Sequence, residues 1–232
     1  MRMRKKPNLA ARVERCAHLL VREPGGYRGK WLDIITSEYQ RHSLGENNEY
    51  GYNELHIELG CGKGRFTVET AKVEAQSATK AGSGVFIIAI EKSADAMIIA
   101  LERAAAEGLR NVRFINAFAD NLADYFAPGE VSRIYLNFCD PWPSNRHSKR
   151  RLTNRRFLEL YMQALCPGGE IHFKTDNLPL FEYSLKEFGH CGFTLTDIKR
   201  DLHKDGPVGV MTDYELKFYN QGLPIYWCRV RK

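Results

Sequence analysis

The chain has 232 residues, of which 44% are hydrophobic and 27% are charged. This is the composition of an ordinary globular protein that buries its core without disulfide or metal staples, and it excludes collagen-like, coiled-coil and wholly disordered chains. The longest apolar run, residues 85–90, is far below the roughly 20 residues of a membrane helix. No apolar stretch follows the basic start at residues 1–7 as it would in a signal peptide. We therefore expect a cytoplasmic protein with no membrane segment.

The positive charge is concentrated in two short segments. The net charge is +6, yet residues 1–15 and 146–156 together carry +11, which leaves −5 on the rest of the chain. One basic segment alone fits a solvated charged face as well as a binding site. Two of them on an acidic body favour binding to a polyanion such as a nucleic acid.

Six cysteines are spread along the chain without any C-x-x-C pair. This spacing predicts neither a zinc site nor a redox pair, and no metal is expected. Without a signal peptide, reduced thiols in a cytosol are favoured over three disulfides. Cys61 and Cys139 lie inside the motifs described below, and we interpret both as small packing residues.

Apolar runs and helical patterns alternate along the chain from residue 55 onward. Strands are expected at residues 55–59, 85–90, 112–115, 133–138, 170–174, 193–198 and 225–229. Helices are expected to begin near residue 65 and to occupy residues 94–107, 155–165 and 178–188. The alternation predicts an α/β fold with a mostly parallel sheet and helices on both faces. No helix is expected between the last two strands, which predicts an antiparallel hairpin at one edge.

Two polar segments suggest how the chain is divided. Residues 43–52 are rich in Gly and Asn and are interpreted as a linker. Residues 1–50 would then form a basic N-terminal arm and linker, and residues 51–232 would form the main domain. Residues 76–84 are interpreted as an enlarged loop before the second strand.

The first strand runs into a glycine-rich loop, ELGCGKG at residues 58–64. Its glycines allow close approach of a ligand to the backbone. Arg65 stands where the dinucleotide pattern needs its third glycine, and no P-loop pattern is present. The acid Glu58 suits a cationic ligand. The pattern resembles the first motif of class I S-adenosylmethionine-dependent methyltransferases; a nucleotide-binding dehydrogenase and a plain tight turn remain as alternatives.

The second strand ends at Glu91, where a doubly wound sheet places a carboxylate against ribose hydroxyls. The enlarged loop accounts for the long separation from the glycines. Glu91 could instead cap the following helix, a role for which Ser93 competes. With the glycines upstream, we favour ribose binding.

The fourth strand ends in the block NFCDPWP, residues 137–143. The carboxyl ends of such strands line the ligand crevice. Two prolines fix the chain after Asp140, and Trp142 offers a flat face to a base. Asp140 as a helix cap and Trp142 as a core aromatic form the alternative. The basic run that follows at once favours the functional interpretation.

Six segments that span nearly the whole chain carry distinctive patterns. They are MRMR with KP in residues 1–7, the glycine loop at 58–64, LNFCDPWP at 136–143, RHSKRRL at 146–152, HFKTDN at 172–177 and MTDYE at 211–215. In this order they resemble the bacterial tRNA (guanine-N(7)-)-methyltransferases. The DPWP block with its basic run, followed by KTDN and T-x-Y-E, is highly specific.

The resemblance implies a Rossmann-like class I methyltransferase fold with a seven-stranded sheet. It implies methyl transfer from S-adenosyl-L-methionine to N7 of a guanine in the variable loop of tRNA, by a monomer or homodimer with no obligate protein partner. The implied cofactor contacts are Glu58, Gly60, Gly62, Gly64, Glu91, Asn116, Phe118 and Asp140, of which Asp140 is also catalytic. The implied guanine contacts are Ser144, Asp176, Thr212, Asp213, Tyr214 and Glu215. The implied RNA contacts are Arg146, Lys149, Arg150 and Arg151.

Two positions depart from the family pattern. Ser144 stands where many relatives have a lysine, so that cation is missing or comes from Arg146 or Lys149. Asn116 stands near the place where many carry an aspartate, which leaves the adenine contact to Asn116 or to backbone. A methyltransferase acting on another RNA or on a small molecule, and a catalytically idle RNA-binding protein, remain alternatives. Loss of Glu91 or of the DPWP aspartate would have favoured idleness, and both are present.

Overall fold

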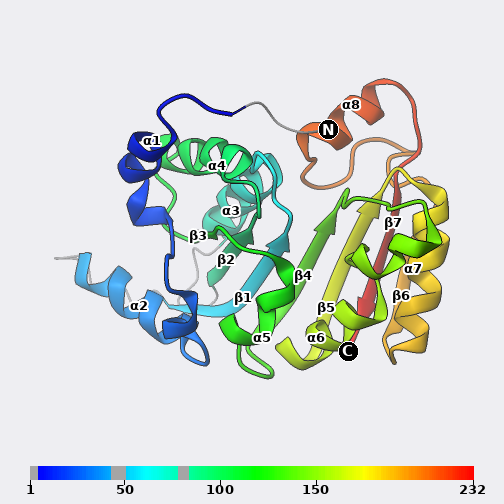
Figure 1. Ribbon diagram of the computed structural model, residues 1–232, viewed down its shortest axis with the longest axis horizontal. Coiled ribbons are helices and arrows are strands. Elements are labelled where there is room, and N and C mark those ends of the chain that lie inside the picture. The colour runs from blue at the N-terminus through cyan, green and yellow to red at the C-terminus, as the bar shows by residue number, and fades with distance from the viewer. Residues whose placement is uncertain (1–4, 43–50, 78–83) are drawn as a thin grey trace.

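One mixed sheet organises the molecule. The computed structural model describes residues 5–42, 51–77 and 84–232, and in these parts seven strands lie in the order β3-β2-β1-β4-β5-β7-β6 (Figure 1). The strands are β1 (Tyr52–Leu59), β2 (Gly84–Ile90), β3 (Val112–Ile115), β4 (Val131–Asn137), β5 (Leu165–Thr175), β6 (Thr194–Lys199) and β7 (Tyr226–Arg231). Only β7 runs antiparallel to its neighbours, β5 and β6. The expected mostly parallel sheet with an antiparallel edge is confirmed.

Helices cover both faces of the sheet, with α1, α3 and α4 on one side and α5, α6 and α7 on the other (Figure 1). The helices are α1 (Leu9–Arg15), α2 (Trp31–His42), α3 (Arg65–Ser77), α4 (Ala94–Ala106), α5 (Leu122–Tyr125), α6 (Arg155–Ala164), α7 (Leu178–His190) and α8 (Asp213–Asn220). Short 3₁₀ helices are η1 (Ala17–Leu19), η2 (Pro24–Tyr27), η3 (Ala119–Asn121) and η4 (Asn145–Arg150). In the described chain, no helix is long and apolar enough to cross a membrane.

The sheet has a hydrophobic core on each face. Strand β2 is buried along its whole length and contributes side chains to both cores. Because successive side chains of a strand point to opposite faces, Ile87 and Ala89 join the core with α3 and α4, while Phe86 and Ile88 join the core with α6 and α7. A central parallel strand that is buried on both sides has this continuous apolar sequence.

The connection between β6 and β7 differs from the expected hairpin, because it contains helix α8. The helix begins with a capping box. The Thr212 side chain accepts a hydrogen bond from the backbone N–H of Glu215, and the Glu215 carboxylate accepts one from the backbone of Thr212. A capping box is a sequence signal for a helix start. The sequence interpretation used these residues as a substrate motif and so missed the helix.

The described part of the basic N-terminal segment packs against the body. Arg12 of α1 pairs with Glu102 of α4 at 2.6 Å. Trp31, at the start of α2, is fully buried and its indole N–H donates to the carbonyl of Tyr125. The division at residue 50 stays a prediction. Most of the expected linker at 43–52 and of the expected loop at 76–84 lies outside the described residues, which resume at residue 51 and at residue 84. The first two residues of that loop are instead the last two of α3.

Candidate active site

The loop after β1 is shaped by its glycines. Gly60 has φ of +79° and Gly62 has φ of +57°, a region that glycine adopts without strain. No described atom lies within 4 Å of a Cβ placed at either position, so the loop backbone is open to a ligand. Gly64 has a different role, because a Cβ there would lie 2.8 Å from the Cα of Ala100 in α4. The absence of its side chain lets the loop pack on that helix.

Glu91 connects the end of β2 to this loop. Its carboxylate is 8% exposed and accepts hydrogen bonds from the backbone N–H groups of Gly62 at 3.0 Å and Ser93 at 2.8 Å. Ser93 is the N-cap of α4. Ser93 therefore caps the helix, and Glu91 is not needed as the cap. Glu91 holds the glycine loop instead. The side chain of Asn116 donates to the carbonyl of Glu91 at 2.7 Å and fixes its backbone.

A cavity of about 600 Å³ opens at the carboxyl ends of β1, β2 and β4. Its lining includes Gly60, Gly62, Glu91, Phe118, Asp140 and Arg156. Phe118 is 63% exposed. The cavity therefore brings together glycine backbone, carboxylates, aromatic rings and cations from segments that are far apart in the sequence.

Glu58 lies beneath the loop and not in this cavity. It is 2% exposed, and its carboxylate accepts hydrogen bonds from the hydroxyl of Thr67 and from the side-chain amide of Asn137, the latter at 3.0 Å. Burial raises the pKa of Glu58. The carboxylate thus connects β1, α3 and β4 under the floor of the site.

Asp140 stands on a strained turn. Its side chain is 69% exposed, and its nearest cation is Lys92, at 3.9 Å. Two non-glycine residues beside it have left-handed backbone, Phe138 with φ of +51° and Trp142 with φ of +41°. Arg151 holds the turn by donating to the carbonyls of Pro141 at 3.1 Å and Trp142 at 2.9 Å. Strain held by surrounding contacts is typical of functional sites.

A second group of side chains meets at the start of α8. The ring of Tyr214 lies 5.4 Å from that of Phe138, between centroids. Desolvation and the nearby Asp176 carboxylate raise the pKa of Tyr214. Asp213 forms an ion pair with Arg103 of α4 at 2.8 Å. The KTDN and T-x-Y-E segments therefore lie next to the end of β4.

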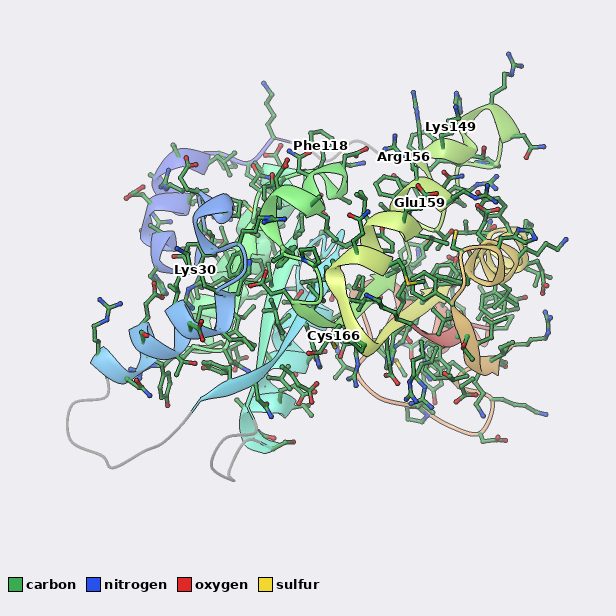
Figure 2. The ribbon with its side chains drawn as sticks, turned by 90° about the horizontal axis from the view of Figure 1, so that it is seen from below. Lys30, Phe118, Lys149, Arg156, Glu159 and Cys166 are labelled. Carbon is green, nitrogen blue, oxygen red and sulfur yellow. The ribbon has the colours of Figure 1, made fainter. Side chains whose placement is uncertain are left out.

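Helix η4 follows the strained turn and carries exposed cations. Arg146, Lys149 and Arg150 are exposed, and no carboxylate of the described residues forms an ion pair with them. The Arg150 guanidinium lies 4.9 Å from the ring centroid of Trp142. Figure 2 shows Lys149 along the same edge of the molecule as Phe118 and Arg156, which line the cavity.

The chain is similar in sequence to known methyltransferases. Residues 52–228 match the model of a family described as "Putative methyltransferase". The chain is 41% identical over 230 residues to the tRNA (guanine-N(7)-)-methyltransferase of Geobacillus kaustophilus (strain HTA426), with 98% of this chain and 95% of that protein covered. It is 40% identical to the protein of the same name from Bacillus velezensis (strain DSM 23117 / BGSC 10A6 / LMG 26770 / FZB42), over 99% of this chain and 96% of the relative. The chain belongs to the tRNA (guanine-N(7)-)-methyltransferase family.

The fold is shared more widely than the family. A 16S rRNA methyltransferase, KamB, superposes with a TM-score of 0.60 at 12% identity, over 86% of this chain and 91% of that one. At this identity the likeness concerns the fold alone. In this tRNA (guanine-N(7)-)-methyltransferase family member, the cavity lies at the carboxyl ends of the parallel strands, where open α/β sheets bind their ligands.

The expected cofactor residues separate into two groups in the structure. Gly60, Gly62, Glu91, Phe118 and Asp140 line the cavity. The other three, Glu58, Gly64 and Asn116, do not line it and instead support the loop and strands around it.

The expected substrate and RNA residues also separate. Tyr214 and Ser144 are exposed, whereas Glu215 is fully buried and bonds to Lys174 and His203. Among the basic residues, Arg151 is 7% exposed and its guanidinium is used inside the protein.

Three charged residues of the cavity were not foreseen from the sequence. Arg156, at the start of α6, lines it and forms an ion pair with Asp120, which also lines it. Lys92 lines it beside Asp140. The sequence shows Arg156 only as part of a basic run. Its pairing could not be read from the sequence, because its partner Asp120 lies 36 residues away. Cys61 is a packing residue as expected, buried and with a raised pKa. Cys139 packs partly against the core, and burial raises its pKa to about 12.

Proposed function

We propose that the protein transfers the methyl group of S-adenosyl-L-methionine to N7 of a guanine in the variable loop of tRNA, and that the reaction takes place in the cavity beside Glu91 and Asp140. The observation that carries the proposal is the junction of this cavity with the cations of η4. Relatives about 40% identical over nearly their full length have the corresponding enzyme name.

The residues around the cavity suit the cofactor. About 600 Å³ is a typical volume for a pocket that encloses a small organic ligand. Glu91 lies at the strand end from which a carboxylate reaches ribose hydroxyls, and the backbone of Gly60 and Gly62 is open to close approach. When bound, S-adenosyl-L-methionine supplies an activated methyl group on a positively charged sulfur. Carboxylates on two walls suit that charge.

The role of Asp140 follows from the chemistry of guanine. N7 carries a lone pair and no proton, so the attacking atom needs no general base. The methylated ring is cationic, and a carboxylate held beside it stabilises that charge as it develops. The turn locked by Arg151 fixes the direction of Asp140 before substrate arrives, and such positioning lowers the barrier by several kcal/mol. Asp140 thus orients and stabilises and does not transfer a proton.

The residues at the start of α8 form the guanine side of the site. The carboxylate of Asp176 can accept hydrogen bonds from the N–H groups of guanine, which separates guanine from adenine. Tyr214, with 49% of its surface exposed, and Phe138 offer aromatic faces to an unstacked base. Ser144 and Thr212 add hydroxyls nearby. The target guanine would leave the tRNA fold to reach these groups, as in other base-modifying enzymes.

The cations of η4 hold the RNA backbone in this proposal. Arg146, Lys149 and Arg150 are free of acidic partners in the described chain and follow the Asp140 turn directly. Phosphate contacts of this kind position a nucleic acid without reading its sequence. The same function implies a cytoplasmic protein, where tRNA is available, acting as a monomer or homodimer.

The decisive experiment is methyl transfer from radiolabelled S-adenosyl-L-methionine into purified bulk tRNA. Ribosomal RNA serves as the substrate control and the Asp140→Ala protein as the enzyme control. We expect label in tRNA with the wild-type protein only, and mapping of the modified nucleotide to place it at N7 of a variable-loop guanine. Label in ribosomal RNA alone would favour another RNA methyltransferase, and tRNA binding without label would favour an idle binding protein.

A further inference from the structure

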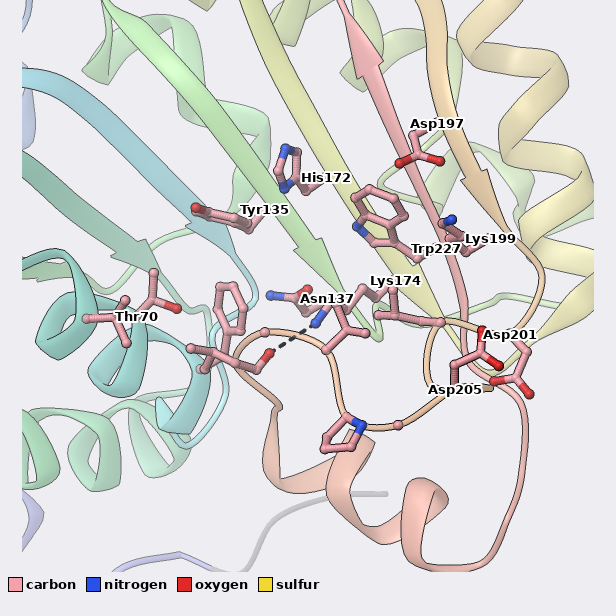
Figure 3. A pocket seen from close by; sticks show the side chains of 18 of the residues that line it. Thr70, Tyr135, Asn137, His172, Lys174, Asp197, Lys199, Asp201, Asp205 and Trp227 are labelled. Carbon is pink, nitrogen blue, oxygen red and sulfur yellow. Dashed lines mark hydrogen bonds between the residues drawn. The ribbon is translucent and has the colours of Figure 1, made fainter. Parts of the chain in front are cut away.

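A second cavity, of about 590 Å³, lies on the α3 face of the sheet (Figure 3). Strands β4 to β7 form its floor, α3 forms one wall, and the loop at residues 201–210 forms the other. It shares no lining residue with the cofactor cavity. None of the cofactor, guanine or RNA contacts proposed above lines it. The methyltransferase site therefore does not account for this second cavity.

The floor of this cavity is aromatic. The ring of Trp227 from β7 lies 5.9 Å from that of His172, and His172 lies 5.6 Å from Tyr135, so three rings form a row across the strands. In Figure 3, Tyr135, His172 and Trp227 follow one another from left to right across the strands. Burial lowers the pKa of His172 to about 4, so the imidazole is uncharged at neutral pH. Val208, in the covering loop, is 50% exposed.

The rim of the cavity carries excess negative charge. Four carboxylates line it, from Glu74, Asp197, Asp201 and Asp205. None of them forms an ion pair within the described residues. The lining cations are Lys199 and Lys174, and the ammonium group of Lys174 is already bound by Glu215 at 3.0 Å. A pocket with this charge attracts a cation, although the whole protein has a net charge of +6.

Two oxygen atoms in the lining lack hydrogen-bond partners. They are Oγ1 of Thr70 and Oδ1 of Asn137, and both residues are 7% exposed. Figure 3 shows Thr70 on α3 and Asn137 on the floor between Tyr135 and Lys174. Buried polar atoms are almost always paired in folded proteins. The amide oxygen of Asn137 can only accept, so it favours a ligand that donates N–H or O–H groups, whereas the Thr70 hydroxyl can accept or donate.

The lining carboxylates do not belong to a cluster that could hold a metal ion. In the parts of the chain that the structure describes, no group of three or more His, Cys, Asp or Glu residues could hold a metal. Carboxylates that come from α3, β6 and the loop at 201–210 instead suit a ligand with several charges joined by aliphatic segments. Aromatic faces favour the same ligand, because ammonium groups are attracted to the face of tryptophan.

We propose that this cavity binds an aliphatic polyamine. Its ammonium groups pair with the carboxylates of Asp197, Asp201 and Asp205, and its methylene segments lie against Trp227 and Val208. The residues named for this contact are not among those that line the cofactor cavity.

The test is a calorimetric titration of spermidine into the full chain without RNA. Asp201→Asn combined with Asp205→Asn is expected to weaken the affinity roughly three- to tenfold, as for two exposed charge pairs. These residues lie on an exposed loop, so the circular dichroism spectrum and Tm should not change. Spermidine should also change the tryptophan fluorescence, and this change should disappear in Trp227→Phe. The affinity for S-adenosyl-L-methionine should stay the same in all variants.

The matched control replaces two exposed carboxylates outside the cavity, Asp33→Asn with Asp124→Asn. It should leave the spermidine affinity within about twofold of wild type. The proposal is overturned if spermidine does not bind, or if the control weakens binding as much as the cavity variant does. It is also overturned if Mg²⁺ at equal ionic strength displaces spermidine fully, or if adenosine binds and spermidine does not.

Discussion

The ammonium group of Lys174 lies 3.0 Å from the carboxylate of Glu215, which is completely buried. This pair joins the end of β5 to the start of α8, and His203 completes it with a contact of 2.9 Å to the same carboxylate. Two motifs that are 41 residues apart are thereby held as one unit. The position of Tyr214 and Thr212 depends on that unit, since both lie in the first turn or cap of α8.

Removing one partner of this pair should destabilise the protein strongly. Lys174→Met leaves the Glu215 carboxylate without its ammonium partner, and breaking a buried pair in this way costs about 3–5 kcal/mol. We expect Tm to fall by roughly 10 °C and KM for tRNA to rise, with little change in cofactor affinity. Asp213→Asn is the matched control for Tm, because it breaks only exposed pairs, with Arg103 and Arg65, each worth less than about 1 kcal/mol. Equal and small changes of Tm in the two variants would contradict the role of Lys174.

Glu91 should contribute strongly to cofactor binding. Glu91→Ala removes charge-assisted hydrogen bonds and is expected to weaken S-adenosyl-L-methionine binding by about 1.5–3 kcal/mol, measured by calorimetry. Glu91→Gln keeps an acceptor for the N–H of Gly62 and separates loop support from charge. Unchanged affinity in a folded Glu91→Ala protein would remove this residue from the site.

Asp140 should affect turnover and not RNA affinity. Asp140→Ala is expected to abolish most methyl transfer while tRNA binding stays nearly intact, because the exposed cations lie on η4, after the turn. Asp140→Asn should retain somewhat more activity if hydrogen bonding contributes, and none if only charge matters. Single-turnover rates and filter binding measure the two effects separately. Near-normal rates in both variants would exclude a central role for this carboxylate.

The salt dependence of tRNA binding should distinguish two classes of basic residue. Each phosphate-binding cation that is removed lowers the slope of log affinity against log salt by roughly 0.7–1. Replacing Arg146, Lys149 and Arg150 by alanine is therefore expected to lower the slope by about two to three. Arg151→Ala should barely change it and should instead reduce Tm, because this guanidinium binds the carbonyls of the Asp140 turn. An unchanged slope in the triple variant would mean that η4 is only a solvated face.

Stability should fall below pH 6.5 because of two buried histidines. Burial lowers the pKa values of His56 and His172 to about 4, whereas the unfolded chain titrates near 6.5. Between these values the unfolded state binds more protons, so the stabilisation is complete above about pH 6.5 and is lost as pH falls toward 4. Urea unfolding at several pH values should show a smaller loss in His172→Gln. His190→Gln, at the exposed end of α7, controls for losing a histidine as such.

The sequence was informative where local patterns decide the structure. The run at residues 85–90 predicted β2 to within one residue, since a strand that is buried on both faces must be continuously apolar. The strand-end position of Glu91 and the glycines at 60 and 62 predicted three lining residues of the cavity for the same kind of reason. The end of the fourth strand indicated Asp140 in the same way, and the family pattern added Phe118.

Partners that meet only in the folded chain could not be read from the sequence. Arg151 looks like its neighbours Arg150 and Lys149, and only the strained turn beside it provides the carbonyls that bind it. Glu215 looks like a surface acid until Lys174 and the capping box bury it. The sign of a charge is visible in sequence, but whether it faces solvent depends on the tertiary structure.

The contact between Gly64 and Ala100 limits how the cofactor loop can move. The Gly64 backbone rests directly on Ala100 of α4, and Glu91 bonds to both the loop and the start of the helix. We therefore expect the loop and the helix to move together. A pocket built in this way exists before its ligand arrives. Little conformational entropy is then lost on binding, so cofactor association should be fast and should follow a single kinetic phase. A methyl group at position 64 would separate the two parts and introduce a slow step.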